Sequence, residues 1–153
     1  MALETSQILE ICKDQPEVTV EAGETIIREG GLHARLLVLI EGSVQVSKND
    51  YEINVVDEPG SVFGEMSLLL NRSHTATLRA LTKCRFRAVE NAEKLVEKNP
   101  VLFVHIARLL ALRLDCLNHY LADIKSQFSD REDHFGMMDE VLDSLMHQQS
   151  SAQ

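Results

Sequence analysis

Positively charged residues are scarce in this sequence. Lys and Arg number 15 against 24 Asp and Glu, which gives a formal net charge of −9 at pH 7. Non-specific affinity for nucleic acid comes from Lys and Arg that neutralise phosphates, so most of this surface repels DNA and RNA. We therefore predict that the chain has no nucleic-acid partner.

Paired cysteines and long apolar runs are also missing. The three cysteines form no Cys-x-x-Cys pair, which suits a reducing cytosol better than a disulfide-stapled fold. Acidic residues interrupt the first fifteen positions, where a secretory signal needs an apolar stretch. The longest apolar stretch, residues 101–114, contains His105, Arg108 and Arg113, and is too short and too charged to span a membrane. We expect a soluble, cytoplasmic protein without a membrane partner.

Signatures of catalysis are absent as well. The sequence has no Gly-x-Ser-x-Gly motif, no nucleophile with a partner base and no P-loop. Before residue 100 the only histidines are His33 and His74, and neither has a second histidine at the short spacing of a strand-borne metal site. This argues against metal-dependent barrel enzymes of the cupin type. We predict a non-enzymatic protein that binds no metal.

Short strands fill the first two thirds of the chain. The apolar content of 44% is enough for one core in a chain of 153 residues. After a leading helix over residues 3–13, short apolar runs between Val18 and Val89 are separated by glycine-bearing turns, and residues 43–47 alternate strictly between apolar and polar. The pattern predicts a mainly β fold with some α, a jelly-roll-type β-barrel (double-stranded β-helix), rather than βαβ units.

Beyond residue 90 the apolar period becomes 3.6. It predicts a short helix over 92–98, a break at Asn99-Pro100, a long helix from Val101 towards Phe128 and a last amphipathic helix after the polar residues 129–133. We divide the chain into a barrel with flanking helices, residues 1–125, and a helical tail, residues 126–153.

The long helix carries a narrow apolar seam. Its members step by four and three residues, as positions a and d of a coiled coil do: Leu110, Leu114, Leu117, Leu121, Ile124 and Phe128. A seam this narrow favours a partner helix, so we expect a homodimer through residues 110–128. The alternative, that the stripe lies on its own barrel, stays open.

Residues 60–77 contain the candidate binding site. Gly64 lets backbone amides approach an anion closely, and a helix beginning at Glu65 would direct the first amides, those of Met66 and Ser67, to the same point. A carboxylate in an anion site is repulsive unless it faces a donor, so Glu65 makes sense if it accepts from a sugar hydroxyl. The two features together describe a site for a sugar phosphate.

The run Phe63-Gly64-Glu65-Met66-Ser67-Leu68-Leu69, followed after a loop by His74-Thr75-Ala76-Thr77-Leu78, resembles the phosphate-binding cassette of cyclic nucleotide-binding domains. The resemblance covers about residues 15–125. It implies a sensor barrel that binds cyclic AMP or cyclic GMP and relays binding to the helices that follow. In such a site Glu65 would hold the ribose 2′-hydroxyl, the amides of Gly64, Met66 and Ser67 the phosphate, and His74 with Thr75 the remaining oxygens, with Ala76 beside them.

His74 departs from the family pattern, which has an arginine at this place. Histidine is mostly neutral at pH 7 and then offers one donor, whereas arginine is always charged and offers a fork, so affinity should fall by about 1.5 to 3 kcal/mol. Arg72 would restore the charge if it reaches into the site, or else it is solvated on its loop. Thr75 stands where a hydroxyl can reach a guanine amino group in this family, which favours cyclic GMP.

One other interpretation stays open and a second is excluded. A degenerate domain would keep the barrel and the dimer seam, bind no nucleotide and act as a protein-interaction module. A transcription regulator of the catabolite-activator kind would need a DNA-binding module, for which the stretch after Phe128 is too short and too acidic. Because the sequence shows no attached channel, kinase or DNA-binding segment, we expect the sensor to pass its signal to an unknown protein partner in trans.

Overall fold

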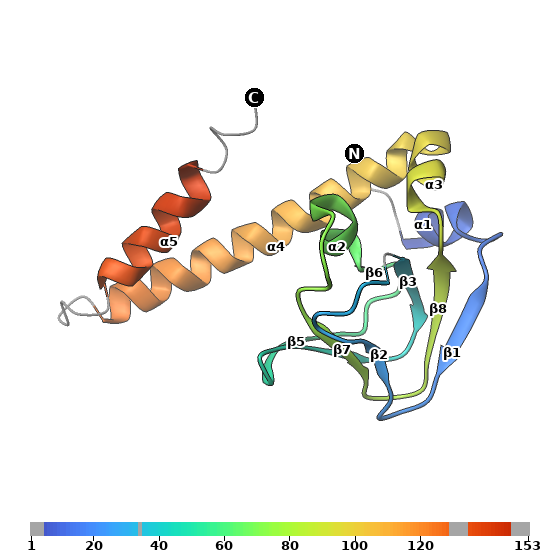
Figure 1. Ribbon diagram of the computed structural model, residues 1–153, viewed down its shortest axis with the longest axis horizontal. Coiled ribbons are helices and arrows are strands. Elements are labelled where there is room, and N and C mark those ends of the chain that lie inside the picture. The colour runs from blue at the N-terminus through green and yellow to red at the C-terminus, as the bar shows by residue number, and fades with distance from the viewer. Residues whose placement is uncertain (1–4, 34, 129–134, 148–153) are drawn as a thin grey trace. The chain divides into compact units, whose positions relative to one another are not determined.

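The computed structural model describes residues 5–33, 35–128 and 135–147. The chain separates into two compact units, Met1–Ala107 and Arg108–Gln153. Thirteen elements are described in these ranges, and Figure 1 shows them in chain order: α1 Thr5–Ile11, β1 Glu17–Val20, β2 Thr25–Ile27, β3 Leu36–Glu41, β4 Val44–Lys48, β5 Tyr51–Val56, β6 Val62–Phe63, α2 Glu65–Leu70, β7 Thr77–Ala80, β8 Cys84–Val89, α3 Ala92–Lys98, α4 Pro100–Gln127 and α5 Phe135–His147.

The first unit contains two four-stranded antiparallel sheets. One has the strand order β1-β8-β3-β6 and the other β2-β7-β4-β5. Strands adjacent in sequence often lie in different sheets, as β1 and β2 do, which is the arrangement of a jelly roll. The structure confirms the predicted barrel, and each strand predicted between Val18 and Val89 is present.

The barrel core lies between the sheets because the strands alternate their side chains between two faces. Leu37 and Leu39 of β3 point into it together with Phe86 of β8, and all three are at most 1% exposed. Phe63 meets Phe86 edge to face, with ring centroids 6.3 Å apart. Leu39 is thus a core residue.

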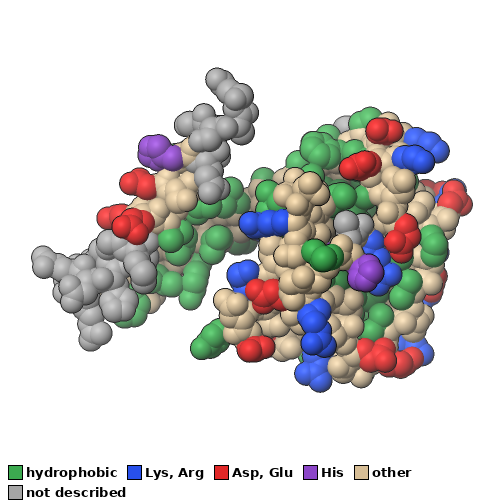
Figure 2. All heavy atoms as spheres, viewed as in Figure 1, with side chains coloured by type: hydrophobic (Ala, Val, Ile, Leu, Met, Phe, Trp, Pro, Cys, Tyr) green, Lys and Arg blue, Asp and Glu red, His purple; other side chains and the backbone are tan. Residues whose placement is uncertain are grey.

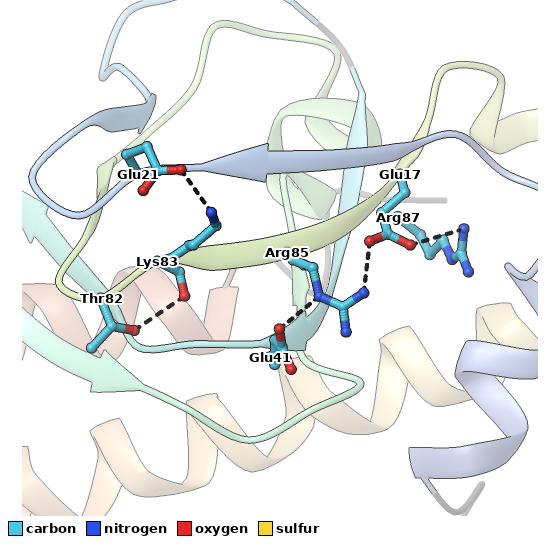
Figure 3. A network of polar contacts seen from close by, with 7 residues as sticks. All are labelled: Glu17, Glu21, Glu41, Thr82, Lys83, Arg85 and Arg87. Carbon is cyan, nitrogen blue, oxygen red and sulfur yellow. Dashed lines mark hydrogen bonds and ion pairs between the residues drawn. The ribbon is translucent and has the colours of Figure 1, made fainter.

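A row of charged side chains crosses three strands of the first sheet (Figure 3). Arg85 of β8 donates from Nη1 to Glu17 of β1 at 2.8 Å and from Nε to Glu41 of β3 at 2.6 Å. Lys83 pairs with Glu21 at 3.0 Å at the end of the row. The bond from Arg85 holds the pKa of the Glu41 carboxyl below its ordinary value of 4.5. The row therefore ties β1, β8 and β3 together on a face that the core does not use.

The three cysteines differ in environment. Cys12 and Cys84 are fully buried and Cys116 of α4 is exposed. Burial raises the pKa of the Cys12 thiol to about 11, although the nearby Arg87 opposes the shift. Burial also raises the pKa of Cys84. Neither buried thiol is a thiolate at neutral pH.

The helices after residue 90 confirm the predicted change of period. Asn91 caps α3 by accepting from the amide of Lys94 at 3.2 Å, and α4 begins at Pro100, a residue suited to the first turn of a helix. The predicted link over residues 129–133 and the end of the tail, residues 148–153, lie outside the described residues. The division at residue 125 stays a prediction.

The second unit consists of the C-terminal part of α4 and the helix α5. Lys125 of α4 forms an ion pair with Asp139 of α5, which joins the two helices. Among the seam residues, Leu121 and Ile124 are half-buried, whereas Leu114 and Leu117 are 41% and 46% exposed. Figure 2 shows hydrophobic side chains exposed on this part of the chain. No helix among the described residues has the length and apolarity needed to cross a bilayer.

Candidate functional site

The turn into α2 requires glycine at its first position. Gly64 has φ 85° and ψ 0°, in the left-handed region. A Cβ atom at this position would lie 2.4 Å from the carbonyl oxygen of Arg35, closer than real Cβ contacts come. The glycine therefore lets the β6–α2 turn pack directly against the backbone that enters β3.

Two amides in the first turn of α2 are not used by the rest of the described chain. The helix begins at Glu65, and the amide of Leu68 donates to the carbonyl of Gly64 at 3.3 Å. The amides of Met66 and Ser67 precede that bond and have no acceptor among the described residues. Such amides carry partial positive charge, and they are the donors that the sequence predicted for an anion.

Two polar side chains of α2 turn inward. Glu65 is 5% exposed and Ser67 is 4% exposed, whereas Met66 between them is 41% exposed. The carboxylate of Glu65 is therefore held inside the protein and not in bulk water. Glu65 and the two amides thus share the first turn of α2, and the role of Glu65 as an acceptor for a sugar hydroxyl stays a prediction.

His74 is fixed from two sides by the segment between β2 and β3. Its amide donates to Gly31 at 2.9 Å and its carbonyl accepts from Gly30 at 2.8 Å. The Nε2 atom of its ring lies 2.6 Å from the carbonyl oxygen of His33, and the residue is 7% exposed. Because a carbonyl only accepts, Nε2 carries the proton in this bond, and only an imidazolium would have a second N–H, at Nδ1, for an anion.

The remaining predicted site residues are Thr75, Ala76 and Arg72. Thr75 is half-buried, and its hydroxyl is 3.8 Å from the sulfur of Met66. Ala76 is also half-buried. Arg72 is exposed, and its guanidinium makes no hydrogen bond or ion pair with any residue in the described ranges. Solvation is thus the state of Arg72 in this structure.

Lys48 is a cation beside the cassette, residues 63–78, that the sequence analysis missed. From the end of β4 its Nζ donates to the carbonyl oxygen of Thr75 at 2.7 Å and lies 3.5 Å from Glu29. Glu29 also accepts from the amide of Asn49 at 3.0 Å, and that bond holds the pKa of its carboxyl below the ordinary value. Because these partners are far apart in sequence, no local pattern could have revealed the contact.

The comparison with protein families decides the identity of the barrel. Residues 17–95, which include the Gly64 turn, Glu65 and His74, match the family model of the cyclic nucleotide-binding domain. The chain belongs to the cyclic nucleotide-binding domain family. The domain is a regulatory module in this family, and the resemblance read from the sequence is confirmed.

Curated relatives are larger proteins that contain such a domain. The chain is 28% identical over 142 residues to the cGMP-dependent protein kinase egl-4 of Caenorhabditis elegans, covering 92% of this chain and 17% of the kinase. It is 35% identical over 85 residues to the potassium/sodium hyperpolarization-activated cyclic nucleotide-gated channel 2 of Homo sapiens, covering 54% of this chain and 9% of the channel. The chain thus spans less than a fifth of the length of these relatives.

A solved structure shares the fold of the domain. The catabolite activator protein of Thermus thermophilus superimposes with a TM-score of 0.68 at 23% identity, covering 80% of this chain and 61% of that chain. The similarity confirms the predicted jelly-roll barrel with a long helix after it. Within the described residues, no group of three or more His, Cys, Asp or Glu side chains is arranged to hold a metal ion.

Proposed function

We propose that this domain is a sensor that binds a cyclic nucleotide in the cassette and relays the occupied state to the helices after residue 100. The observation that carries the proposal is the pair of unused amides, Met66 and Ser67, next to the buried carboxylate of Glu65. A cyclic nucleotide offers a phosphate for the amides and a ribose 2′-hydroxyl for the carboxylate. One ligand can therefore contact both groups at once.

His74 sets the affinity of this site. In the neutral form its one N–H is engaged by the carbonyl of His33, so the ring adds nothing to phosphate binding. An imidazolium would keep that bond and donate a second N–H from Nδ1 to the phosphate. Binding is therefore weaker than with the family arginine, whose guanidinium always carries a charge and a fork of donors.

Calorimetric titration with cyclic GMP tests this role. His74→Arg should tighten binding by about one to two decades, because a guanidinium stays charged and offers parallel donors to the phosphate. Glu65→Gln, which keeps the shape of the side chain, should weaken binding by about tenfold. If His74→Arg binds cyclic GMP no more tightly than the native chain, His74 does not lie at the phosphate site.

Among cyclic nucleotides we propose cyclic GMP as the preferred ligand. The hydroxyl of Thr75 lies beside Met66 and follows His74 directly, where it can reach an exocyclic amino group of a guanine. A cGMP-dependent kinase among the relatives supports the same choice.

Competition between the two nucleotides checks the preference. Thr75→Val removes the hydroxyl and retains the branched shape, so the ratio of cyclic GMP to cyclic AMP affinity should fall by about threefold to tenfold. A ratio that is unchanged in Thr75→Val, in a variant that still binds both ligands, would contradict the assignment of Thr75.

A second candidate is a degenerate domain that binds no nucleotide and acts as a dimeric protein-interaction module. The short contact between Nε2 of His74 and the carbonyl of His33 favours this candidate, because the N–H of the ring is then bonded within the protein and is not offered to a ligand. The same titrations separate the candidates. If neither the native chain nor His74→Arg binds cyclic GMP or cyclic AMP, the degenerate domain is the correct description.

We further propose that the domain acts as a homodimer through residues 110–128 of α4 and passes its signal to a protein partner in trans. The support is the exposure of large apolar side chains on this helix. Leu114, Leu117 and Phe128 are each more than 40% exposed. Exposing such large apolar side chains to water is unfavourable, so the surface they form favours a partner. A second copy of the same helix offers the matching seam.

A further inference from the structure

A cavity opens at the edge of the barrel where β1 and β2 lie. Its volume is about 480 Å³, within the range of about 300 to 1,000 Å³ typical of small-molecule sites. None of the predicted cassette residues lines it. The lining residues come from β1, β2, β3 and β8 and from the turns beside them: Val18, Val20, Glu24, Thr25, Ile26, Arg28, Arg35, Leu37 and Phe86.

The floor of the cavity is apolar. Leu37 and Phe86 are core residues that are at most 1% exposed. Val18, Val20 and Ile26 pack against that core and remain half-buried, because β1 and β2 end their sheets and leave the gap between the sheets open. An apolar body in the cavity would cover these three side chains and displace water from them.

The polar lining has an excess of positive charge. Arg28 has no ion pair or side-chain hydrogen bond to any other residue that the structure describes. Arg35 is 3.7 Å from Glu90, whose side chain is 69% exposed, so that pair is weak. The carboxylate of Glu24 already accepts from the amide of Glu21 at 3.0 Å in its own turn. Two guanidinium groups therefore face the cavity with one partly engaged carboxylate.

The cavity and the cassette lie on either side of one segment of backbone. Arg28 and Arg35 are the two ends of the segment between β2 and β3. The carbonyl of Arg35 is the group against which Gly64 packs, and the carbonyl of His33 between them holds His74. The side chains of Arg28 and Arg35 line the cavity, while the backbone of the same segment serves the cassette. The two are separate sites.

We propose that this cavity is a second binding site, which takes a small oxyanion carried on an apolar body. Arg28 and Arg35 hold the oxyanion, because a guanidinium presents parallel N–H donors that match a carboxylate or a phosphate. The apolar body lies on Val18, Val20 and Ile26. A neutral or cationic ligand of the same size leaves the guanidinium groups without a partner.

The test uses the full chain with three eight-carbon probes: octanoate, octyl phosphate and the neutral 1-octanol. Methyl NMR of Val, Leu and Ile reports where each probe binds, and calorimetric titration reports its affinity. We expect octanoate and octyl phosphate to shift the methyls of Val18, Val20 and Leu37, and 1-octanol at equal concentration to leave them in place. Tighter binding of octyl phosphate than of octanoate assigns the site to phosphate monoesters, and the reverse order assigns it to carboxylates.

Variants distinguish specific binding of the anion in the cavity from non-specific binding to apolar surface. The double variant Arg28→Ala/Arg35→Ala truncates side chains outside the core and should weaken binding of both anions by about tenfold to a hundredfold. Val20→Phe should block the cavity by filling it. Lys94→Ala removes an exposed cation on α3 and serves as the matched control, with binding unchanged. Equal shifts from 1-octanol, shifts confined to exposed leucines of α4, or full anion binding by the double variant would each overturn the proposal.

Discussion

The contact between Gly64 and Arg35 makes a quantitative prediction. In Gly64→Ala a residue with a side chain must adopt φ 85°, and the left-handed conformation costs about 1 to 2 kcal/mol for a residue other than glycine. In addition the new Cβ must move from 2.4 Å to at least 3.0 Å from the carbonyl oxygen of Arg35, which requires a shift of backbone. Such overpacking costs about 1 to 3 kcal/mol. We expect the free energy of unfolding to fall by about 2 to 5 kcal/mol.

Gly30→Ala is the matched control for this substitution. Gly30 has φ 81°, close to that of Gly64, but a Cβ on it would meet nothing within 4 Å. The control therefore carries the conformational cost without the clash, and the difference between the variants isolates the close approach.

Urea denaturation followed by circular dichroism measures both variants, and titration with cyclic GMP follows the site. Gly64→Ala should lose more than about tenfold in cyclic GMP affinity, since the turn that presents the Met66 and Ser67 amides must move. Gly30→Ala should keep most of the affinity. Equal unfolding free energies for the two variants would refute the argument that backbone contact at Gly64 shapes the cassette.

Two further predictions concern the helices and the charged row. We expect the native chain to have the mass of a dimer in light scattering and the double variant Leu114→Lys/Leu117→Lys that of a monomer, because paired lysines in an a/d seam repel. Equal masses for the two proteins would remove the seam from the interface. Glu41→Gln should lower the urea midpoint at neutral pH. The pKa of Glu41 is lowered in the folded state by Arg85, so its contribution is present above about pH 4.5 and is lost as the pH falls through the lowered value. The urea midpoints of the native chain and Glu41→Gln should therefore converge in acid. The control Glu93→Gln should have the native midpoint at every pH. A difference between Glu41→Gln and the native chain that does not change with pH would contradict the role of the Glu41–Arg85 pair.

Much of the barrel could be predicted from the sequence, because strand alternation and turn glycines are local signals. Residues 43–47 alternate in the sequence, and all but the first of them lie in β4, Val44–Lys48. The two-residue strand β6 was missed, since Val62 and Phe63 are too few to show a period and become a strand only by pairing with Leu37 and Val38. The long helix was predicted because its period persists over many turns.

The cassette was predictable in its backbone and less so in its side chains. Gly64 and Glu65 carry a motif whose geometry is local, and both occupy the predicted positions. The bond of His74 to the carbonyl of His33 and the bond of Lys48 to Thr75 join residues 41 and 27 positions apart. Only the folded chain brings such partners together, and the cavity at the β1–β2 edge depends in the same way on how the two sheets diverge.

The contrast among the three cysteines has a practical consequence for measurement. Cys12 and Cys84 are shielded and hold their protons, whereas Cys116 lies exposed on α4. A maleimide fluorophore or spin label added to the folded native protein should therefore attach at one place on the long helix, without mutagenesis. That label gives a direct optical or magnetic reading of whether a second helix comes near, and of whether ligands at the barrel change its surroundings.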